Sequence, residues 1–318
     1  MPDSTLYNRR TALKTLAFTC GSLALPAIAQ DSIRKLGKTI KLGVITDTHI
    51  GLLPKAEDRL HAFLTEMNKE KPNALLQLGD FAFPNKKNQP FVDAFNNAHK
   101  HVFHTIGNHD IRDYGHTNED CLKSWGMPAP YYSKEVEGLR IIVLYGNDKG
   151  SPTHKGGYPS YVGKEQQAWL ETELKAAKTP VLIVCHQPFA GLGSVNNAKE
   201  MQQLLSKYKE KIVLCIHGHT HLDTMLTIEG VSYLHINSAS YYWVGGKVRY
   251  AEYKDPLFCT LTLDPTKGEI IVKGTKTEWK TKTPEELGYF KGDRAKYKNL
   301  VVPKISDRII SNKTNSTK

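Results

Sequence analysis

The sequence predicts an α/β fold in which two β-sheets pack face to face and helices cover their outer sides. Two observations lead to this prediction. The first two thirds of the chain alternate short apolar runs with stretches of helical periodicity, as strands joined by helices do. The remainder changes to paired strand-like runs separated by turns that contain Gly or Pro, which is typical of β-hairpins. With 318 residues, the chain can bury a core of this size.

The chain begins its regular structure with a strand–helix–strand unit. The apolar runs "IKLGVIT" (40–46) and "ALLQLGD" (74–80) are short and rich in branched residues, so they predict buried strands. Between them, apolar residues recur every three or four positions over 57–69, which predicts an amphipathic helix. Pro72 ends this helix because proline cannot continue it.

The same alternation continues toward the middle of the chain. In order, we expect a helix over 91–98, a strand within 101–110, a loop that contains Trp125, a hairpin-like strand pair over 131–146, a helix over 163–177, a strand over 180–188, a helix over 199–208 and a strand within 211–221. Two hairpins are expected after this, over 224–240 and 256–274, because both stretches alternate around glycine-containing turns.

Residues 1–29 have the features of an export signal. Arg9-Arg10 is followed by an apolar residue and a lysine, and then by a modest apolar run. Ala27-Ile28-Ala29 offers a small-x-small cleavage pattern. This arrangement resembles a twin-arginine signal peptide, which engages the twin-arginine export machinery and carries folded proteins. We therefore expect a periplasmic or secreted protein whose mature chain starts near Gln30 and contains no membrane span.

The positive charge of the chain is concentrated at its C-terminal end. The formal net charge is +11, and residues 280–318 hold ten Lys and Arg against four Asp and Glu, a net of +6. We expect a polar tail over 280–318 that packs peripherally or frays, following a domain over 30–279. No basic stripe with interleaved aromatic residues is present, so nucleic acid is not an expected partner. A disulfide between Cys185 and Cys215 stays open, since export permits one.

Five of the predicted strands stop at clusters of polar residues. The clusters are Asp47-x-His49, Gly79-Asp80, Gly107-Asn108-His109-Asp110, Cys185-His186 and Gly218-His219-Thr220-His221. The carboxyl ends of the strands in an α/β sheet share one edge, where ligands bind, so these side chains are expected to converge. One strand-end histidine is weak evidence, because most are simply hydrogen-bonded. Five such clusters are not explained by turns and caps.

The residue types favour a centre for two metal ions. Carboxylate, imidazole and amide oxygen suit Zn, Mn and Fe(II), and the absence of cysteine argues against a closed structural zinc site. Two ions about 3.5–4 Å apart need roughly seven protein ligands and one shared carboxylate. A strand-like backbone would send His219 and His221 to the same side. His217 lies outside this pattern, and we favour a buried, hydrogen-bonded imidazole over a role behind the ligands.

Together, the motifs "DTH…GD…GNHD…H…GHTH" between Asp47 and His221 resemble the calcineurin-like metallophosphoesterase family. The resemblance implies a four-layer α/β/β/α sandwich of two mixed β-sheets flanked by helices. Residues 81–83, "FAF", lack the tyrosine of the purple, iron–tyrosinate members, so the chain resembles the single-domain, non-purple branch. The start of a metallo-β-lactamase pattern is also present at 219–223, but Thr224 stands where that pattern has histidine.

The resemblance also implies a role for each matching residue. The implied metal ligands are Asp47, His49 and His221 for one ion, Asp80 as the bridge, and Asn108, His186 and His219 for the other. His109 would contact the phosphate and protonate the leaving oxygen, and Asp110 would hold the His109 ring. The implied cofactors are two divalent ions, with Zn, Mn, Fe and Co all suitable.

The function implied is hydrolysis of a small phosphate ester by metal-bound hydroxide. The branch includes cyclic-nucleotide and glycerophosphodiester phosphodiesterases, so a phosphodiesterase is favoured. An exported phosphomonoesterase of broad specificity and a non-catalytic periplasmic metal- or ligand-binding protein stay open as alternatives. Loops over 110–120, 147–161 and 237–246 are expected to form the substrate walls. Their aromatic residues would stack on a base or sugar or would pack the loops themselves; these residues are Tyr114, His116, Tyr241, Tyr242 and Trp243.

Overall fold

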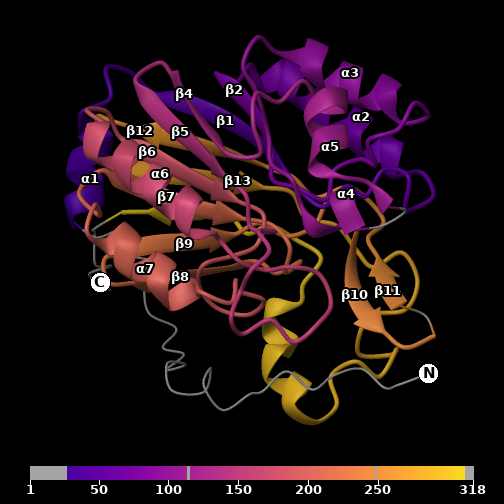
Figure 1. The fold of residues 1–318 in the computed structure, drawn as a ribbon. Helices are drawn as coiled ribbons and strands as arrows, with labels where there is room; N and C mark the ends of the chain where they lie inside the picture. Colours follow the sequence, from indigo (N-terminus) through magenta and orange to yellow (C-terminus); the bar gives the residue numbers. More distant parts are fainter. Residues whose placement is uncertain (1–26, 113–114, 248, 312–318) are drawn as a thin grey trace, which may run out of the picture.

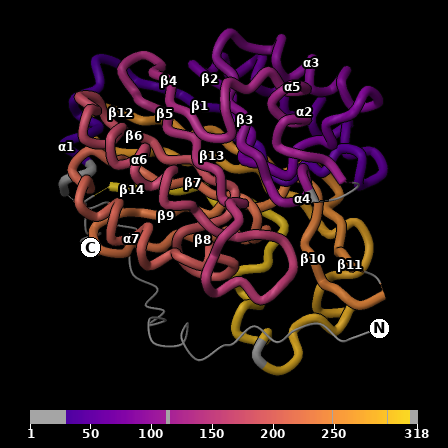
Figure 2. Tube along the Cα trace, in the orientation of Figure 1, coloured from indigo at the N-terminus to yellow at the C-terminus, as the bar shows by residue number. Residues whose placement is uncertain are grey.

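The computed structural model describes residues 27–112, 115–247 and 249–311 (Figure 1). Most of the expected signal peptide, as well as Tyr114, lies outside these residues. The described chain forms two six-stranded mixed sheets that pack face to face, with helices on both outer sides (Figures 1 and 2). The expected four-layer α/β/β/α architecture is therefore confirmed.

The first sheet combines the start of the chain with its end. Its strand order is β14-β13-β12-β1-β2-β3. The strands are β1 (Ile40–Ile45), β2 (Ala74–Gln77), β3 (Val102–His104), β12 (Cys259–Asp264), β13 (Glu269–Gly274) and β14 (Arg308–Ile310). β1, β2 and β3 run parallel, whereas β12 pairs with β1 antiparallel. The carboxyl ends of β1, β2 and β3 therefore meet at one edge, as the polar clusters require.

The second sheet is built from the middle of the chain, in the order β4-β5-β6-β7-β9-β8. Its strands are β4 (Tyr132–Val136), β5 (Leu139–Leu144), β6 (Val181–Cys185), β7 (Ile212–His217), β8 (Thr224–Ile228) and β9 (Val231–His235). β5, β6, β7 and β9 are parallel, while β4 and β8 close the two edges as antiparallel hairpin partners. The predicted strand pairs over 131–146 and 224–240 are these two hairpins.

Helices cover each sheet on its outer face. The helices over the first sheet are α2 (Ala56–Glu70), α3 (Gln89–Ala98) and α5 (Asn118–Trp125), and those over the second are α6 (Lys164–Ala176) and α7 (Ala198–Ser206). The helices can cover the sheets because apolar residues one turn apart form a single buried face. Phe63 and Met67 of α2 are such a pair. A helix at α5 was not expected. Thr117 caps it by accepting a hydrogen bond from the backbone N–H of Asp120, in a reciprocal capping box.

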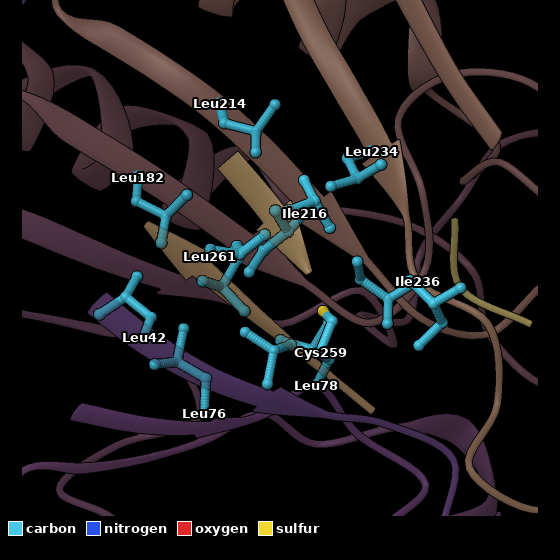
Figure 3. Packing of buried hydrophobic residues seen from close by; sticks show 14 of the residues in the cluster. Leu42, Leu76, Leu78, Leu182, Leu214, Ile216, Leu234, Ile236, Cys259 and Leu261 are labelled. Atoms are coloured by element: carbon cyan, nitrogen blue, oxygen red, sulfur yellow. The ribbon is translucent and has the colours of Figure 1, made fainter. Parts of the chain in front are cut away.

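The main core lies between the two sheets (Figure 3). Leu42 and Leu76 from the first sheet and Leu182 and Ile216 from the second are buried there with other aliphatic side chains (Figure 3). Burying one such side chain contributes about 1.5–3 kcal/mol, so this interface holds the two sheets in fixed relation. Loops from both sheets can therefore build one site at the shared end of the sandwich.

Helix α1 (Ala27–Arg34) closes the opposite end of the core, beside the start of β1 (Figure 1). Ile33 and Leu36 are buried among the residues between the sheets. Cys185 and Cys215 are free and buried, so the open disulfide is not formed in this structure. Among the described residues, no helix has the length and apolar character to cross a membrane.

The C-terminal segment is joined to the body of the domain. β14 adds an edge strand to β13, and Val301 and Ile305 are buried in the main core. Arg308 donates to the Asp223 carboxylate at 2.5 Å, and Asp223 also accepts the Ser306 N–H at 3.0 Å. Asp223 lies two residues after His221, so the end of the chain is attached to the loop that carries this predicted ligand.

We expect Arg308→Ala to lower the free energy of unfolding by about 3–5 kcal/mol, because it leaves a buried carboxylate without its partner. The two side chains are only 8% and 2% exposed. Chemical denaturation followed by circular dichroism would measure the change. The control is Lys254→Ala, whose pair with Glu278 is 62% and 79% exposed and should contribute little. Equal effects of the two variants would contradict this account of the C-terminal segment.

Candidate metal centre

The five polar clusters converge where the carboxyl ends of both sheets meet. The Asp47 N–H donates to the Gly79 carbonyl at 3.0 Å, and the His49 N–H donates to the Asp80 carbonyl at 2.9 Å. The loops after β1 and β2 thus continue the strand pairing beyond the sheet. Across the sheets, the His219 N–H donates to the Asp47 carboxylate at 3.1 Å. The loop after β7 is therefore tied to the loop after β1.

Five of the predicted ligands have a left-handed backbone. The φ angles are 54° at Asp47, 56° at His49, 49° at Asp80, 66° at His219 and 51° at His221. The expectation of a strand-like backbone at "HTH" was wrong, since β7 ends at His217 and the chain turns there. Non-glycine residues rarely adopt this region, and such strain persists only where the surroundings enforce it. Here, these turns bring side chains from separate loops together.

Glycine is required where the loops touch. A Cβ at Gly107 would overlap the backbone nitrogen and carboxylate of Asp80. A Cβ at Gly218 would overlap the Thr46 hydroxyl and lie 2.6 Å from the Asp47 carboxylate. These glycines explain why two of the sequence clusters begin with Gly: the backbone must approach the carboxylates without a side chain between them.

The first group of candidate ligands consists of Asp47, His49 and His221, whose ligand atoms all lie within 4.8 Å of one another. His221 Nε2 is 3.0 Å from the Asp47 carboxylate. His49 Nδ1 lies 2.8 Å from the Asp47 carbonyl, so it carries the proton and leaves Nε2 as the acceptor nitrogen. His49 Nε2 is 3.5 Å from Asp80, which connects this group to the next one.

The second group consists of Asp80, His186 and His219, again with ligand atoms within 4.8 Å of one another. His186 Nε2 lies 3.1 Å from the Asp80 carboxylate and 4.0 Å from that of Asp47. Its Nδ1 faces the Leu78 carbonyl at 2.8 Å, which fixes the ring and directs Nε2 toward the carboxylates. Asp80 is thus next to histidines of both groups, as a bridging carboxylate must be.

Unpartnered buried atoms show that the site fits metal ions. The amide oxygen of Asn108 and Nδ1 of His221 are buried without a hydrogen-bond partner among the described residues. Buried polar atoms of this kind are costly unless something else satisfies them. Oxygen and nitrogen donors from Asp47, Asp80, Asn108 and the histidines suit borderline divalent ions. The structure therefore brings together six of the seven side chains that the sequence assigned to metal binding, and the seventh, Asn108, is buried directly after the glycine that contacts Asp80.

The pKa values of the site reflect a local excess of negative charge. Burial opposes protonation of His186, yet the carboxylates of Asp80 and Asp47 raise its pKa to about 9. Burial works against ionisation of Asp47, but His221 and His186 lower the pKa of Asp47 to about 2. Burial and the nearby His186 lower the pKa of His219 to about 3, so this ring is neutral and ready to bind an ion. A proton on His186 supplies positive charge that a metal would otherwise provide.

His109 lies beside the candidate metal ligands, whereas Asp110 is bonded to backbone groups of the loops. The His109 ring is half-buried, 5.2 Å from the His49 ring, and forms a close group with His49 and Asp80. Asp110 was expected to hold this ring. Its carboxylate instead accepts the backbone N–H groups of Asp80, Phe81 and Gly107 at 2.7–2.9 Å. Burial and the charge of Asp80 raise the pKa of Asp110 to about 8, while the backbone donors from Gly107 and Phe81 oppose this. In these bonds Asp110 positions the bridging residue.

Two tyrosines reach the site from the expected wall loops. The Tyr158 hydroxyl is 2.9 Å from Nε2 of His219, and the Tyr241 hydroxyl is 3.2 Å from Nε2 of His49. Tyr241 was predicted only as a residue that stacks on substrate or packs its loop, and Tyr158 was not singled out. The available signal for Tyr158 was the pair Gly156-Gly157, whose positive φ angles turn the chain just before it.

The other aromatic candidates and His217 lie away from the ligands. His116 packs on Phe83 with ring centroids 5.7 Å apart, and Tyr242 packs on Tyr289 at 5.2 Å. His217 is fully buried, and its Nδ1 lies 3.0 Å from the Cys185 carbonyl. The favoured interpretation of His217 as a buried, hydrogen-bonded imidazole agrees with this position.

The fold and this centre define a protein class in which two sheets present a carboxylate–histidine site at their shared end. A family model described as calcineurin-like phosphoesterase matches residues 40–223, more than half of the chain. The chain belongs to the calcineurin-like phosphoesterase family. No curated protein matches the sequence.

Solved structures with the same fold are distant in sequence. A dimetal phosphatase from Danio rerio is 14% identical, with 74% of this chain and 96% of that chain covered and a TM-score of 0.55. GAP50, described as the anchor in the inner membrane complex of Plasmodium, is 15% identical, with coverages of 80% and 94% and a TM-score of 0.54. TT1561 of Thermus thermophilus is 8% identical, with coverages of 74% and 98% and a TM-score of 0.50. At these identities, the similarity concerns the fold alone.

Binding of Mn²⁺ to the metal-free protein should release at least one proton per chain at pH 7. The raised pKa of His186, about 9, means that its ring is protonated at pH 7 and must lose the proton to bind an ion. Affinity should therefore rise with pH and level off above the pKa. Calorimetry in two buffers with different ionisation enthalpies would count the protons.

The matched control for this measurement is His61→Gln, because His61 is exposed on α2 and should leave the proton count unchanged. His186→Ala should reduce both the metal content and the number of protons released. Metal binding to the unaltered protein with no buffer dependence would contradict the protonated state of His186.

Proposed function

We propose that this protein, a metal-dependent phosphoesterase by family, holds two divalent ions and hydrolyses phosphodiesters. The observation that carries the proposal is the bridging position of Asp80. Its carboxylate lies 3.5 Å from Nε2 of His49 and 3.1 Å from Nε2 of His186, one histidine from each ligand group. A single structural ion would not need two ligand groups joined in this way.

The chain's own residues would divide the work of hydrolysis between them. Asp47, His49, Asp80 and His221 would hold one ion, and Asp80, Asn108, His186 and His219 the other. When bound, such ions supply positive charge that stabilises the transferring phosphoryl group and favours water as the nucleophile. His109, beside both groups, would give a proton to the leaving oxygen. Asp110 would keep the Asp80 loop in place.

A diester substrate is supported by the neutral character of the nearby donors. The hydroxyls of Tyr158 and Tyr241 lie next to the ligand nitrogens of His219 and His49. Hydroxyl donors suit the single charge of a phosphodiester, whereas a monoester would bring a second charge to be neutralised. An exported monoesterase is the competing enzyme. GAP50, described as an anchor, shares the fold, so a non-catalytic protein is a further outcome to test.

Metal analysis and steady-state kinetics on one purified mature sample would test the proposal. We expect about two ions per chain and a higher kcat/KM for bis(p-nitrophenyl) phosphate than for p-nitrophenyl phosphate. Preference for the monoester would support a phosphatase instead. Two bound ions without turnover of either ester would refute the enzyme proposal and favour a binding protein.

Replacing His109 by alanine should lower kcat by about 10²–10⁴-fold, the usual contribution of a positioned acid. Metal content should stay at the level of the unaltered protein, as measured by elemental analysis of the same sample. A matched variant, Asn108→Ala, should lose metal as well as activity. If His109→Ala lost metal in parallel, its assignment as a proton donor would be refuted.

We also propose that residues 1–29 direct export to the periplasm or beyond. Support comes from the paired arginines and from the burial of Ile33 and Leu36, which follow the proposed cleavage site by a few residues. Changing Arg9 and Arg10 together to lysine should leave full-length, uncleaved protein in the cytoplasm. Cell fractionation with N-terminal sequencing would measure this, and unchanged cleavage would refute a twin-arginine route.

A further inference from the structure

The hairpin β10–β11 places aromatic side chains beside the metal centre. β10 (Tyr241–Gly245) pairs antiparallel with β11 (Arg249–Glu252) as a separate two-stranded sheet. It extends from the end of the sandwich next to α4 (Asn108–Arg112) (Figure 1). Because side chains alternate along a strand, Tyr241 and Trp243 share one face of the hairpin and Tyr242 and Val244 share the other.

One face of the hairpin is anchored. Tyr242, Val244 and Ala251 are buried in the main core, and Tyr242 donates to the Tyr289 hydroxyl at 3.1 Å. Arg59 of α2 holds the ends of the hairpin, donating to the carbonyls of Ala239 at 2.8 Å and Tyr253 at 2.7 Å. Such contacts leave little freedom to the base of the hairpin, so its other face has a fixed direction.

The other face carries three rings, Tyr241, Trp243 and Tyr250, which we call the aromatic strip. Trp243 stands opposite Tyr250 in the strand register, and the rings of Tyr241 and Tyr250 are 5.4 Å apart. The strip runs from inside to outside: Tyr241 is 2% exposed, Tyr250 is half-buried, and Trp243 is 48% exposed. Within the described part of the chain, the side chain of Trp243 makes no hydrogen bond or ring contact with another side chain.

The inner end of the strip touches the metal centre. The Tyr241 ring lies 4.8 Å from that of His221 and 4.9 Å from that of His49. Trp243 is two residues further along the same face, about 7 Å away at the usual rise of a strand. A phosphate held by the metal ligands would therefore have its substituent next to the strip, at a distance that suits the base of a nucleoside.

We propose that the aromatic strip binds the planar aromatic substituent of the substrate, which makes a nucleoside phosphodiester the preferred substrate class. This rests on the proposed phosphodiesterase function and specifies its substrate. A large aromatic side chain that is half exposed on a fixed hairpin beside a site is suited to stacking on a base, which contributes substantially to binding without sequence-specific contacts. An alkyl substituent would gain only hydrophobic contact there.

Two esters with the same leaving group would test the inference. Thymidine 5′-(p-nitrophenyl phosphate) and methyl p-nitrophenyl phosphate both release p-nitrophenolate, so the contribution of that group cancels in the ratio of their kcat/KM values. The metal-loaded protein should prefer the thymidine ester by about tenfold or more, in the range of base–aromatic stacking. Trp243→Ala should reduce this ratio about tenfold, and Trp243→Phe, which retains a ring, should restore most of it.

The matched control is Ile309→Ala, because Ile309 is also an exposed apolar residue, at 62%, but lies on β14 at the other end of the molecule (Figure 2). It should leave the ratio unchanged. Turnover of both esters with equal kcat/KM, or a ratio unaffected by Trp243→Ala, would overturn the inference and leave the phosphodiesterase proposal standing. A change in gel-filtration size with Trp243→Ala at an unchanged ratio would also overturn it, since the strip would then contact a second copy.

Failure of the phosphodiesterase proposal itself would give a different experimental result. In that case the metal-loaded protein would turn over neither ester, although elemental analysis showed about two ions per chain.

Discussion

Two buried carboxylates, Asp47 and Asp80, are the constraint on which the rest of the structure depends. They are 0% and 2% exposed, and burying charge is costly unless partners of opposite charge or hydrogen-bond donors surround it. Backbone N–H groups of His109 and His219 supply part of this compensation. The imidazole rings compensate the rest of the buried negative charge, and in the metal-loaded protein the metal ions would do so as well. The unusual backbone and the glycines of the site follow from bringing these donors close enough.

The sandwich meets this constraint by joining the loops at its shared end through bonds between side chains and backbone. The Asp110 carboxylate accepts the Asp80 N–H, and the Asp80 carboxylate accepts the His109 N–H, which locks the loops after β2 and β3 together. Ser238 and Ser240 donate to the carbonyls of Asp47 and Thr48 and so hold the loop after β1. These are side-chain-to-backbone bonds, so they fix the path of the main chain as well as the position of each ligand.

The sequence predicted the layers and the ligand clusters because both depend on local pattern: apolar periodicity marks the strands, and polar residues mark their ends. It did not predict the left-handed turns at His219 and His221, because a strand-like continuation after β7 was the simplest extension of the pattern. The hydrogen bonds of Asp110 were also not predicted, since two of its three backbone partners, Asp80 and Phe81, are 30 and 29 residues away in the sequence. The Gly156-Gly157 pair indicates a turn before Tyr158, but it does not indicate that the Tyr158 hydroxyl reaches His219, which lies 61 residues further along the chain.

The pairing of β1 with β12 and the bond between Arg308 and Asp223 determine the order in which contacts around the centre can form during synthesis. During synthesis, β1 emerges early but remains the edge of an incomplete sheet until residues 259–264 have been made. The loop that carries His221 gains its Arg308 contact later still, because Arg308 follows Asp223 by 85 residues. The loops of the centre therefore receive part of their support from segments far along the chain, β12 and Arg308, which follow all of the candidate ligands in the sequence.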